Sequence, residues 1–497
     1  MTDRNDPTDL DADELSRAIH ARHWSCREVM AAYLARIHRL NPHLNAIVNL
    51  APDETLLRQA DERDAELAHG QSRGWMHGMP QAIKDTGHAL GFPTTFGTPL
   101  LKDALATTDS LHVARMKAAG AVVVGKTNMP EFGLGSHTFN PLFGATRNAW
   151  DSSVTAGGSS GGAAVCLAQR LLPVADGSDF MGSLRNPAGW NHLFGLRPSQ
   201  GRVPAWPKPD VFVSQLGTDG PMGRTVRDVA RLLSIQAGYD ARVPLSIANG
   251  SQGIGPQGMG PQGMGPQDFV PGPQASVRGK RIAWLGDLGG HLAVEAGILP
   301  LCEQALARMA GEGAHIEPIS LGFDADRLWQ AWLQWRGALT APAVAAVIGQ
   351  PGARARIKPE ALWEYDQAQG LKVVDFMQAA QTRTAFYQHM LGLMQRFDAI
   401  ALPVAQVWPF PIGLDWPHQV AGRSMDTYHH WMECTLYATF AGLPAISVPA
   451  GFDATGRWPM GLQLIGRPQG DAALLELAAG YELLLGDELH RRPPEPV

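Results

Sequence analysis

The sequence predicts an α/β protein in which helices flank a β-sheet core. Apolar runs of strand length, such as residues 121–124 and the AISVPAGF and MGLQLIG segments near the C-terminus, alternate with longer helix-like segments. Of the 497 residues, 45% are hydrophobic, which is enough apolar material for a large core. The length alone would allow several domains, but large α/β folds also run as one unit.

The beginning of the chain has a helical pattern. Residues 12–40 have the periodicity of two helices, and Ser25 with Glu28 forms a capping-box pair at the start of the second. Asn41 and Pro42 are expected to stop that helix. The composition then divides the chain into five segments: a helical part (1–65), an α/β core (66–245), an insertion (246–276), a helix-rich region (277–430) and a strand-and-helix C-terminal part (431–497).

The insertion is the low-complexity part of the sequence. Residues 253–267 read GIGPQ-GMGPQ-GMGPQ, three copies of a five-residue unit. A period of five excludes a collagen helix, which requires glycine at every third position. The repeat is therefore predicted to be a mobile surface insertion with no catalytic part.

Composition argues against several classes of protein. A net charge of −6 and a sequence pI near 6.3 do not favour nucleic acid as a partner. The cysteines are widely spaced and form no CxxC pair, so reduced thiols are expected, and the 17 histidines form no paired metal motif. No apolar run approaches the roughly 20 residues of a membrane span, and the acidic start lacks the features of a secretory signal. A cytoplasmic location is expected.

Two serines framed by glycine carry the catalytic signal. Ser159 lies in GGSSGG and Ser183 in GSDFMGSLRNP, 24 residues apart, and Lys84 lies upstream in an apolar setting, AIKD. Glycine lets a carbonyl substrate approach the nucleophile and lets several N–H groups turn to one side. Together these are the parts of a hydrolase in which lysine replaces histidine as proton acceptor.

The loop that carries Ser183 is predicted to form an oxyanion hole. The backbone N–H donors would come from Phe180, Met181, Gly182 and Ser183. Removal of one such donor typically costs roughly 3–4 kcal/mol of transition-state stabilisation. This loop is therefore expected to contribute strongly to catalysis.

Lys84 must lose its charge to act as a base. The pKa of a free lysine lies near ~10.4, and a base would need about 7–8, a shift that burial can produce. Ala82 and Ile83 are compatible with burial, whereas Asp85 opposes it. Adjacent strand residues face opposite sides, so Asp85 is expected to point away from Lys84.

Two other motif matches are rejected. GAVVVGKT, residues 120–127, fits the phosphate-binding pattern, but its middle residues have the character of a strand and Asn128-Met129-Pro130 follows where a helix should begin. GGSSG, residues 157–161, fits the nucleophile elbow of α/β-hydrolases, but a turn-like segment precedes it instead of a strand.

The chain resembles the amidase signature family over nearly its whole length. The resemblance is carried by GMPQAIKD, GGSSGG, GSDFMGSLRNP, FGLRPSQGRVP and AGLPAISVPAGF. It implies a mixed twisted β-sheet flanked by helices, with the C-terminal part rejoining the core and residues 277–430 contributing to the substrate pocket. It also implies roles for individual residues: Ser183 as nucleophile, Ser159 as the bridging serine on a cis peptide, Lys84 as base, Ser160 as a hydrogen-bond partner of the lysine, and Asp179 and Arg185 as braces of the nucleophile loop.

One position departs from the family pattern. The family usually has glycine where Met181 stands, so a narrowed or reshaped acyl pocket is expected. Seven tryptophans of the helix-rich region and the segment after it are candidates for that pocket, and at most two of them are expected to line it: Trp329, Trp332, Trp335, Trp363, Trp408, Trp416 and Trp431.

The resulting hypothesis is a hydrolase that cleaves a C–N bond of a small, apolar or aromatic linear amide through an acyl-enzyme on Ser183. The chemistry needs no metal or organic cofactor, and a small-molecule amide is the expected partner, without nucleic acid or membrane. Alternatives are the glutamine-hydrolysing component of a tRNA-dependent amidotransferase, a carbamate, lactam or ester hydrolase on the same site, and a non-catalytic binding protein on this scaffold. A homodimer is compatible with the resemblance, and the oligomeric state stays open.

Overall fold

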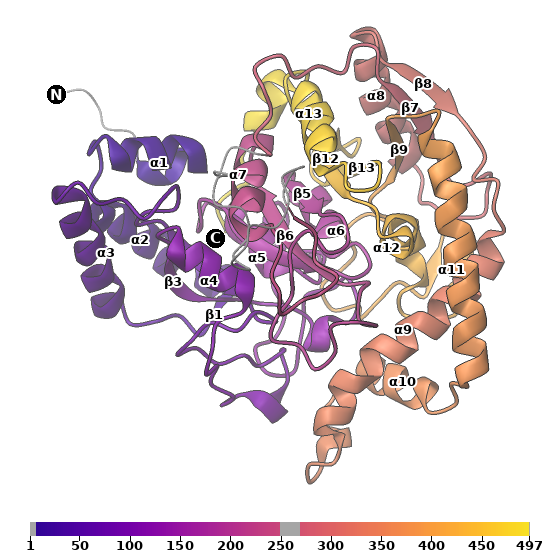
Figure 1. Ribbon diagram of the computed structural model, residues 1–497, viewed down its shortest axis with the longest axis horizontal. Helices are drawn as coiled ribbons and strands as arrows, with labels where there is room; N and C mark the ends of the chain where they lie inside the picture. Colours follow the sequence, from indigo (N-terminus) through magenta and orange to yellow (C-terminus); the bar gives the residue numbers. More distant parts are fainter. Residues whose placement is uncertain (1–5, 249–268, 497) are drawn as a thin grey trace.

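A large mixed β-sheet runs through the molecule, with helices on both sides (Figure 1). The computed structural model describes residues 6–248 and 269–496. The predicted mobile repeat, residues 253–267, lies outside the described residues. In Figure 1 the N-terminal helices α1–α3 and the helices α9–α11 lie at opposite ends of the protein. The predicted α/β class is confirmed.

The large sheet has eight strands in the order β4-β6-β5-β12-β13-β9-β7-β8. From β4 to β9 every neighbouring pair is antiparallel, and β9-β7 and β7-β8 are parallel. The strand segments predicted near the C-terminus are its centre, β12 and β13. The strands are β4 (Ala175–Asp179), β5 (Phe194–Arg197), β6 (Thr218–Gly223), β7 (Arg281–Trp284), β8 (His315–Pro318), β9 (Ala399–Pro403), β12 (Ala445–Phe452) and β13 (Pro459–Ile465).

A second, three-stranded sheet has the order β1-β3-β2 and holds the two most deeply buried lysines. Its strands are β1 (Ile47–Val48), β2 (Pro80–Lys84) and β3 (Val122–Thr127). Strands β2 and β3 are parallel, with Ile83 opposite Lys126 and Lys84 opposite Thr127. Because Lys126 lies inside β3 and no helix starts there, the rejected phosphate-binding motif is indeed a strand. A two-residue hairpin, β10 (Gln419–Val420) with β11 (Arg423–Ser424), lies apart from both sheets.

The helices α1 (Ala12–His20), α2 (Cys26–Leu44) and α3 (Asp53–Ala68) form the N-terminal end. The capping box of Ser25 and Glu28 is present at the start of α2. The prediction that Asn41 and Pro42 stop α2 is wrong, because the helix continues to Leu44 and ends at Asn45 with φ of 53°. Pro42 is tolerated in the last turn, and the Asn41 side chain accepts the N–H groups of residues 46 and 47 just beyond the helix.

The remaining helices cover the sheets and build the helix-rich region. Three tryptophans of that region lie in α9, where Trp329, Trp332 and Trp335 are buried in the core, as their helical spacing predicts. The helices are α4 (Leu111–Ala118), α5 (Gly161–Ala168), α6 (Arg185–Gly189), α7 (Val226–Gln236), α8 (Ile298–Gly311), α9 (Ala325–Ile348), α10 (Pro359–Ala368), α11 (Val373–Met394), α12 (Leu436–Ala441) and α13 (Asp471–Glu482).

Among residues 6–248 and 269–496, no helix has the length and apolar character needed to cross a membrane. The same residues contain no group of three or more His, Cys, Asp or Glu side chains arranged to hold a metal ion. The four cysteines are buried and unpaired.

Candidate active site

The predicted catalytic residues come from three separate segments and meet where the two sheets face each other. Lys84 is the last residue of β2, and Ser159 and Ser160 immediately precede α5. Ser183 lies in the loop between β4 and α6. The peptide bond between Gly158 and Ser159 is cis, as the family resemblance implies. The lysine and the three serines are almost completely buried.

The amine of Lys84 is surrounded by serine oxygens. Its Nζ lies 2.8 Å from Ser159 Oγ, 2.9 Å from Ser160 Oγ and 2.9 Å from Ser178 Oγ. A fourth contact, of 3.2 Å, is made to the carbonyl oxygen of Ser178. In the described part of the chain no carboxylate forms an ion pair with this amine. Hydroxyl groups can both donate to and accept from nitrogen, so they hold the neutral amine as well as the ammonium.

Burial determines the charge of Lys84. It lowers the pKa of Lys84 to about 7, against the opposing attraction of Asp219, Asp179 and Asp176. The predicted orientation of Asp85 is confirmed, because its carboxylate lies 3.3 Å from Lys126 Nζ and accepts the N–H of Thr95 instead of meeting Lys84. Near neutral pH an appreciable fraction of Lys84 is therefore neutral and able to accept a proton.

Asp179 holds the nucleophile loop in place. Its carboxylate accepts the N–H groups of Gly182 (2.9 Å) and Leu184 (3.2 Å) on either side of Ser183. Arg185 Nε and Arg197 Nη1 lie 3.0 and 3.4 Å from the same carboxylate. Burial alone would raise the pKa of Asp179, but the two arginines outweigh it and hold this pKa far below its usual range. Asp179 is therefore ionised and structural.

The predicted oxyanion donors divide into two groups. The N–H of Gly182 points back to Asp179, so the prediction that it is an oxyanion donor is wrong for this conformation. Within residues 6–248 and 269–496, no internal hydrogen bond engages the N–H groups of Phe180, Met181 and Ser183. Gly182 has φ of +86°, and a Cβ there would lie 2.6 Å from Thr435, so glycine is required for the turn itself.

A cavity of about 180 Å³ opens next to the two serines. Ser159, Ser178 and Ser183 line it together with apolar side chains and two cations, Lys208 and Arg336, and no carboxylate is among its described lining residues. The apolar lining side chains are Phe132, Leu134, Phe180, Met181, Leu339, Ala343 and Met432. None of the seven tryptophans considered in the sequence lines it.

Met181 forms part of the cavity wall, and Arg336 of α9 holds it. The Nη1 of Arg336 lies 3.8 Å from Met181 Sδ, and its Nη2 donates to Tyr428 Oη at 2.5 Å. The Nε of Arg336 pairs with Glu364, to which Tyr428 also donates. The arginine charge is thus balanced within the wall. Met181 is only 2% exposed, and a narrowed or reshaped pocket at this position stays a prediction.

Sequence reasoning missed two residues that contact Lys84. Ser178 supplies both a hydroxyl and a carbonyl to the amine, and Asp176 accepts the backbone N–H of Lys84 at 3.2 Å. The signal was the segment ADGSD, residues 175–179, which alternates polar and small residues in a strand that is otherwise buried. Alternation places Asp176 and Ser178 on one face, which is the face toward Lys84.

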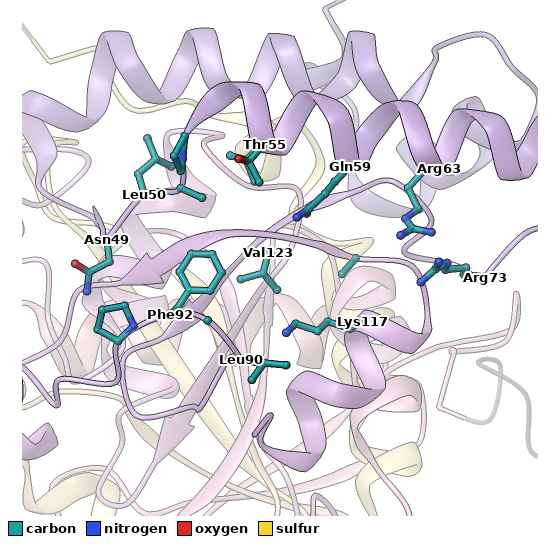
Figure 2. A pocket seen from close by; sticks show the side chains of 16 residues that line it. Asn49, Leu50, Thr55, Gln59, Arg63, Arg73, Leu90, Phe92, Lys117 and Val123 are labelled. Carbon is teal, nitrogen blue, oxygen red and sulfur yellow. The ribbon is translucent and has the colours of Figure 1, made fainter. Parts of the chain in front are cut away.

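A larger hollow, of about 630 Å³, lies away from the serines (Figure 2). It is bounded by α3, by the N-terminal part of β3 and by the loop around Phe92. Arg63 and Arg73 at one end share the carboxylate of Glu66, and Lys117 pairs with Asp109. Its larger volume does not make it the active site, because none of the predicted catalytic residues lines it.

Comparison with known proteins agrees with this geometry. The Amidase family model matches residues 28–475. An acylamidase of Rhodococcus erythropolis is 32% identical over 481 residues, covering 95% of each chain. A component of the glutamyl-tRNA(Gln) amidotransferase of Chloroflexus aurantiacus is 34% identical over 491 residues, again with 95% coverage of both. The crystal structure of a bacterial aryl acylamidase superposes with a TM-score of 0.85 at 30% identity and covers 96% of each chain.

These observations define the class of protein as a hydrolase that acts on C–N amide bonds. The chain belongs to the amidase signature family.

Proposed function

We propose that this enzyme hydrolyses a linear amide with a small, apolar or aromatic substituent through an acyl-enzyme on Ser183. The observation that carries the proposal is the environment of Lys84. A buried amine with three serine hydroxyls at 2.8–2.9 Å and a pKa lowered to about 7 is suited to accept and return a proton. Two of these serines, Ser159 and Ser178, line the same cavity as Ser183.

The proposed reaction proceeds in two stages. Ser183 attacks the amide carbonyl while its proton passes to Ser159 and the proton of Ser159 passes to neutral Lys84. The free N–H groups of Phe180, Met181 and Ser183 stabilise the oxyanion. The Lys84 ammonium returns the proton through Ser159 to the departing amine, and water then hydrolyses the acyl-enzyme by the same relay.

The cavity supports the substrate class. A volume of about 180 Å³ suits a small group and lies below the range of roughly 300–1,000 Å³ of drug-sized pockets. Seven apolar side chains line its wall beside the serines and two cations, Lys208 and Arg336, and Glu364 balances the charge of Arg336. The acylamidase relatives are consistent with this assignment.

The second candidate function is glutamine hydrolysis within an amidotransferase, favoured by the relatives with that name. Free glutamine carries an α-ammonium group, which in a closed pocket requires an acidic or acceptor partner. The absence of carboxylates among the described lining residues favours an uncharged substrate instead. Carbamates, lactams and esters can react through the same acyl-enzyme and belong in the substrate panel.

The test is mass spectrometry after treatment with a fluorophosphonate, applied to the wild type, Ser183→Ala and Lys84→Ala. We expect one adduct on Ser183 in the wild type, none on that peptide in Ser183→Ala and slow labelling in Lys84→Ala. Ser183→Ala should also lower kcat by at least about a thousandfold, since it removes the nucleophile. Labelling of a different serine, or full turnover by Ser183→Ala, would refute the nucleophile assignment.

A substrate panel then separates the candidate functions. Matched anilides with acetyl and larger aliphatic or aromatic acyl groups are compared with glutamine, a lactam, a carbamate and an ester. The proposal expects the highest kcat/KM on a neutral linear amide. Glutamine as the best substrate would favour the amidotransferase-type function.

A further inference from the structure

A buried histidine lies between two carboxylates beside the catalytic lysine. His112, on α4, is 3% exposed. Its Nε2 lies 3.7 Å from Asp176 Oδ2, and its Nδ1 lies 3.5 Å from Asp219 Oδ2. The doubly protonated ring can present an N–H to each carboxylate, whereas the neutral ring has only one N–H to offer. The arrangement thus favours the imidazolium.

The same two carboxylates act on Lys84. Asp176 Oδ2 accepts the backbone N–H of Lys84. Asp219 lies directly opposite Ser178 in the β4–β6 pair, and Ser178 contacts the Lys84 amine. Both carboxylates favour the charged form of Lys84 and so oppose its function as a base. Burial of Lys84 outweighs them, and a cation paired with the two carboxylates would weaken their attraction further.

Two other charges near Lys84 and His112, those of Asp179 and Lys126, are already paired. Asp179 is balanced by Arg185 and Arg197, and Lys126 is paired with Asp85. Within the described residues, His112 is the one basic side chain within ion-pair distance of either Asp176 or Asp219. Three carboxylates act on the charge of Lys84, those of Asp176, Asp179 and Asp219. The groups that act on the charge of His112 are Asp176, Asp219, Lys126 and His88. Lys208 interacts with Asp219 from beyond ion-pair distance.

We propose that His112 is a positioning residue whose imidazolium, held between Asp176 and Asp219, offsets their charge and thereby keeps Lys84 available as a neutral base. Burial opposes the charge on His112, but Asp219 and Asp176 outweigh it and raise the pKa of the ring above its ordinary value. The inference rests on the proposed role of Lys84 as the base. His112 itself need not touch the substrate.

The experiment is the pH dependence of kcat/KM on a neutral anilide for the wild type, His112→Gln, Asp219→Asn and the double variant. Loss of the imidazolium leaves two carboxylates uncompensated, which raises the pKa of Lys84. We expect the acid limb of His112→Gln to move to higher pH by at least about half a unit. Activity near pH 6 should then fall about threefold or more, while the alkaline plateau changes little.

The double variant makes the test specific. Removal of the Asp219 charge in the His112→Gln background should return the acid limb toward the wild-type position. His192→Gln is the matched control, since His192 is also a buried histidine but contacts a backbone carbonyl and no carboxylate side chain. Its acid limb should not move. Thermal melts establish that each variant is folded.

The outcomes separate this inference from the proposed function. An unchanged acid limb in His112→Gln, or an equal loss of activity at every pH, would overturn the role of His112. If Lys84→Ala is inactive in the same experiments, the assignment of Lys84 as the base still holds. Substantial activity in Lys84→Ala would overturn the base assignment and this inference with it. If His112→Gln does not fold, Asp219→Asn must still reduce the pKa of the His112 ring in an NMR titration, and an unaltered pKa would contradict the proposed pairing.

Discussion

Two buried lysines on neighbouring strands have opposite partners. Lys84 is the last residue of β2, and Lys126 lies in the parallel neighbour β3, opposite the residue that precedes Lys84. Both lysines are at most 1% exposed. Lys126 Nζ lies 3.3 Å from Asp85 and donates to the carbonyl oxygens of Gly87 (2.6 Å) and Pro93 (3.3 Å). Lys84 instead meets three hydroxyls and, within the described residues, no carboxylate.

The difference indicates which surroundings suit the proposed role of Lys84 as a base. Burial lowers the pKa of both lysines, but Asp85 beside Lys126 opposes this with a direct ion pair. The carbonyl groups around Lys126 accept hydrogen bonds and cannot donate, so they suit the ammonium form. The hydroxyls around Lys84 suit either form. Depth of burial is therefore shared by the two lysines, and the chemistry of the partners distinguishes structure from catalysis.

The largest expected effect is on the hydroxyl-bonded lysine. Lys84→Ala removes the proposed base and should lower kcat by at least about a hundredfold, the usual scale for general-base catalysis. The measurement is kcat on a neutral anilide, with the melting temperature as a control for folding. A loss of less than about tenfold would mean that another group accepts the proton. Lys84 would then not differ from Lys126 in having a catalytic role.

Substitution of the ion-paired lysine, Lys126, should lower the stability of the fold and leave the catalytic rate largely unchanged. Lys126→Met leaves the Asp85 carboxylate buried without its cation, which should lower the free energy of unfolding by about 3–5 kcal/mol. Denaturant unfolding measures this loss. The kcat of the remaining folded enzyme should stay within a fewfold of the wild type, and a loss as large as that of Lys84→Ala would remove the distinction.

The comparison also predicts a pH profile. Lys84 is protonated below its pKa of about 7 and neutral above it, so kcat/KM should fall about tenfold per unit as pH drops below 7 and should level off on the alkaline side. Initial rates on a neutral anilide between pH 5 and 9 test the sign and the midpoint. An acid limb centred near pH 4–5 would indicate a carboxylate as the base.

The smallest expected effect concerns the cavity wall, which neither lysine builds. Met181→Gly removes a side chain that lines the cavity and contacts Arg336. We expect a fewfold rise in kcat/KM for an anilide with a bulkier acyl group relative to acetanilide, and an unchanged acid limb. The ratio of the two kcat/KM values is the readout. A collapse of both values together would mean that Met181 supports the oxyanion loop rather than limiting the size of the cavity.

Local sequence patterns predicted correctly those features that depend on interactions between residues close together in the chain. The capping box at Ser25 and the strand alternation that turns Asp85 away from Lys84 were both predictable, because they depend on neighbours in the chain. The end of α2 was not predictable from Pro42 alone, since a proline in the last turn of a helix costs the helix little stability. The donor role of Gly182 failed for a different reason, because Asp179 engages its N–H.

Distant segments supplied what the sequence could not indicate. The cavity wall at Met181 is held by Arg336 and Tyr428. Arg336 lies 155 residues after Met181 in the chain, and Tyr428 lies further still. His112 carries no motif, and only the tertiary fold brings this residue of α4 between Asp176 of β4 and Asp219 of β6. Glycine-framed serines indicate a catalytic loop, whereas a wall residue or an isolated histidine has no such local mark.

The sequence by itself determined the candidate nucleophile, the bridging serine and the lysine, because their chemistry depends on residue type and on glycine-rich backbone around them. The tertiary structure decided which lysine meets hydroxyls instead of a carboxylate, which N–H groups of the nucleophile loop lack an internal partner and how small the cavity is. A pKa depends on burial and on charges contributed by many segments, and a cavity depends on the side chains that meet across it. Both are properties of the packed chain, so no window of sequence contains them.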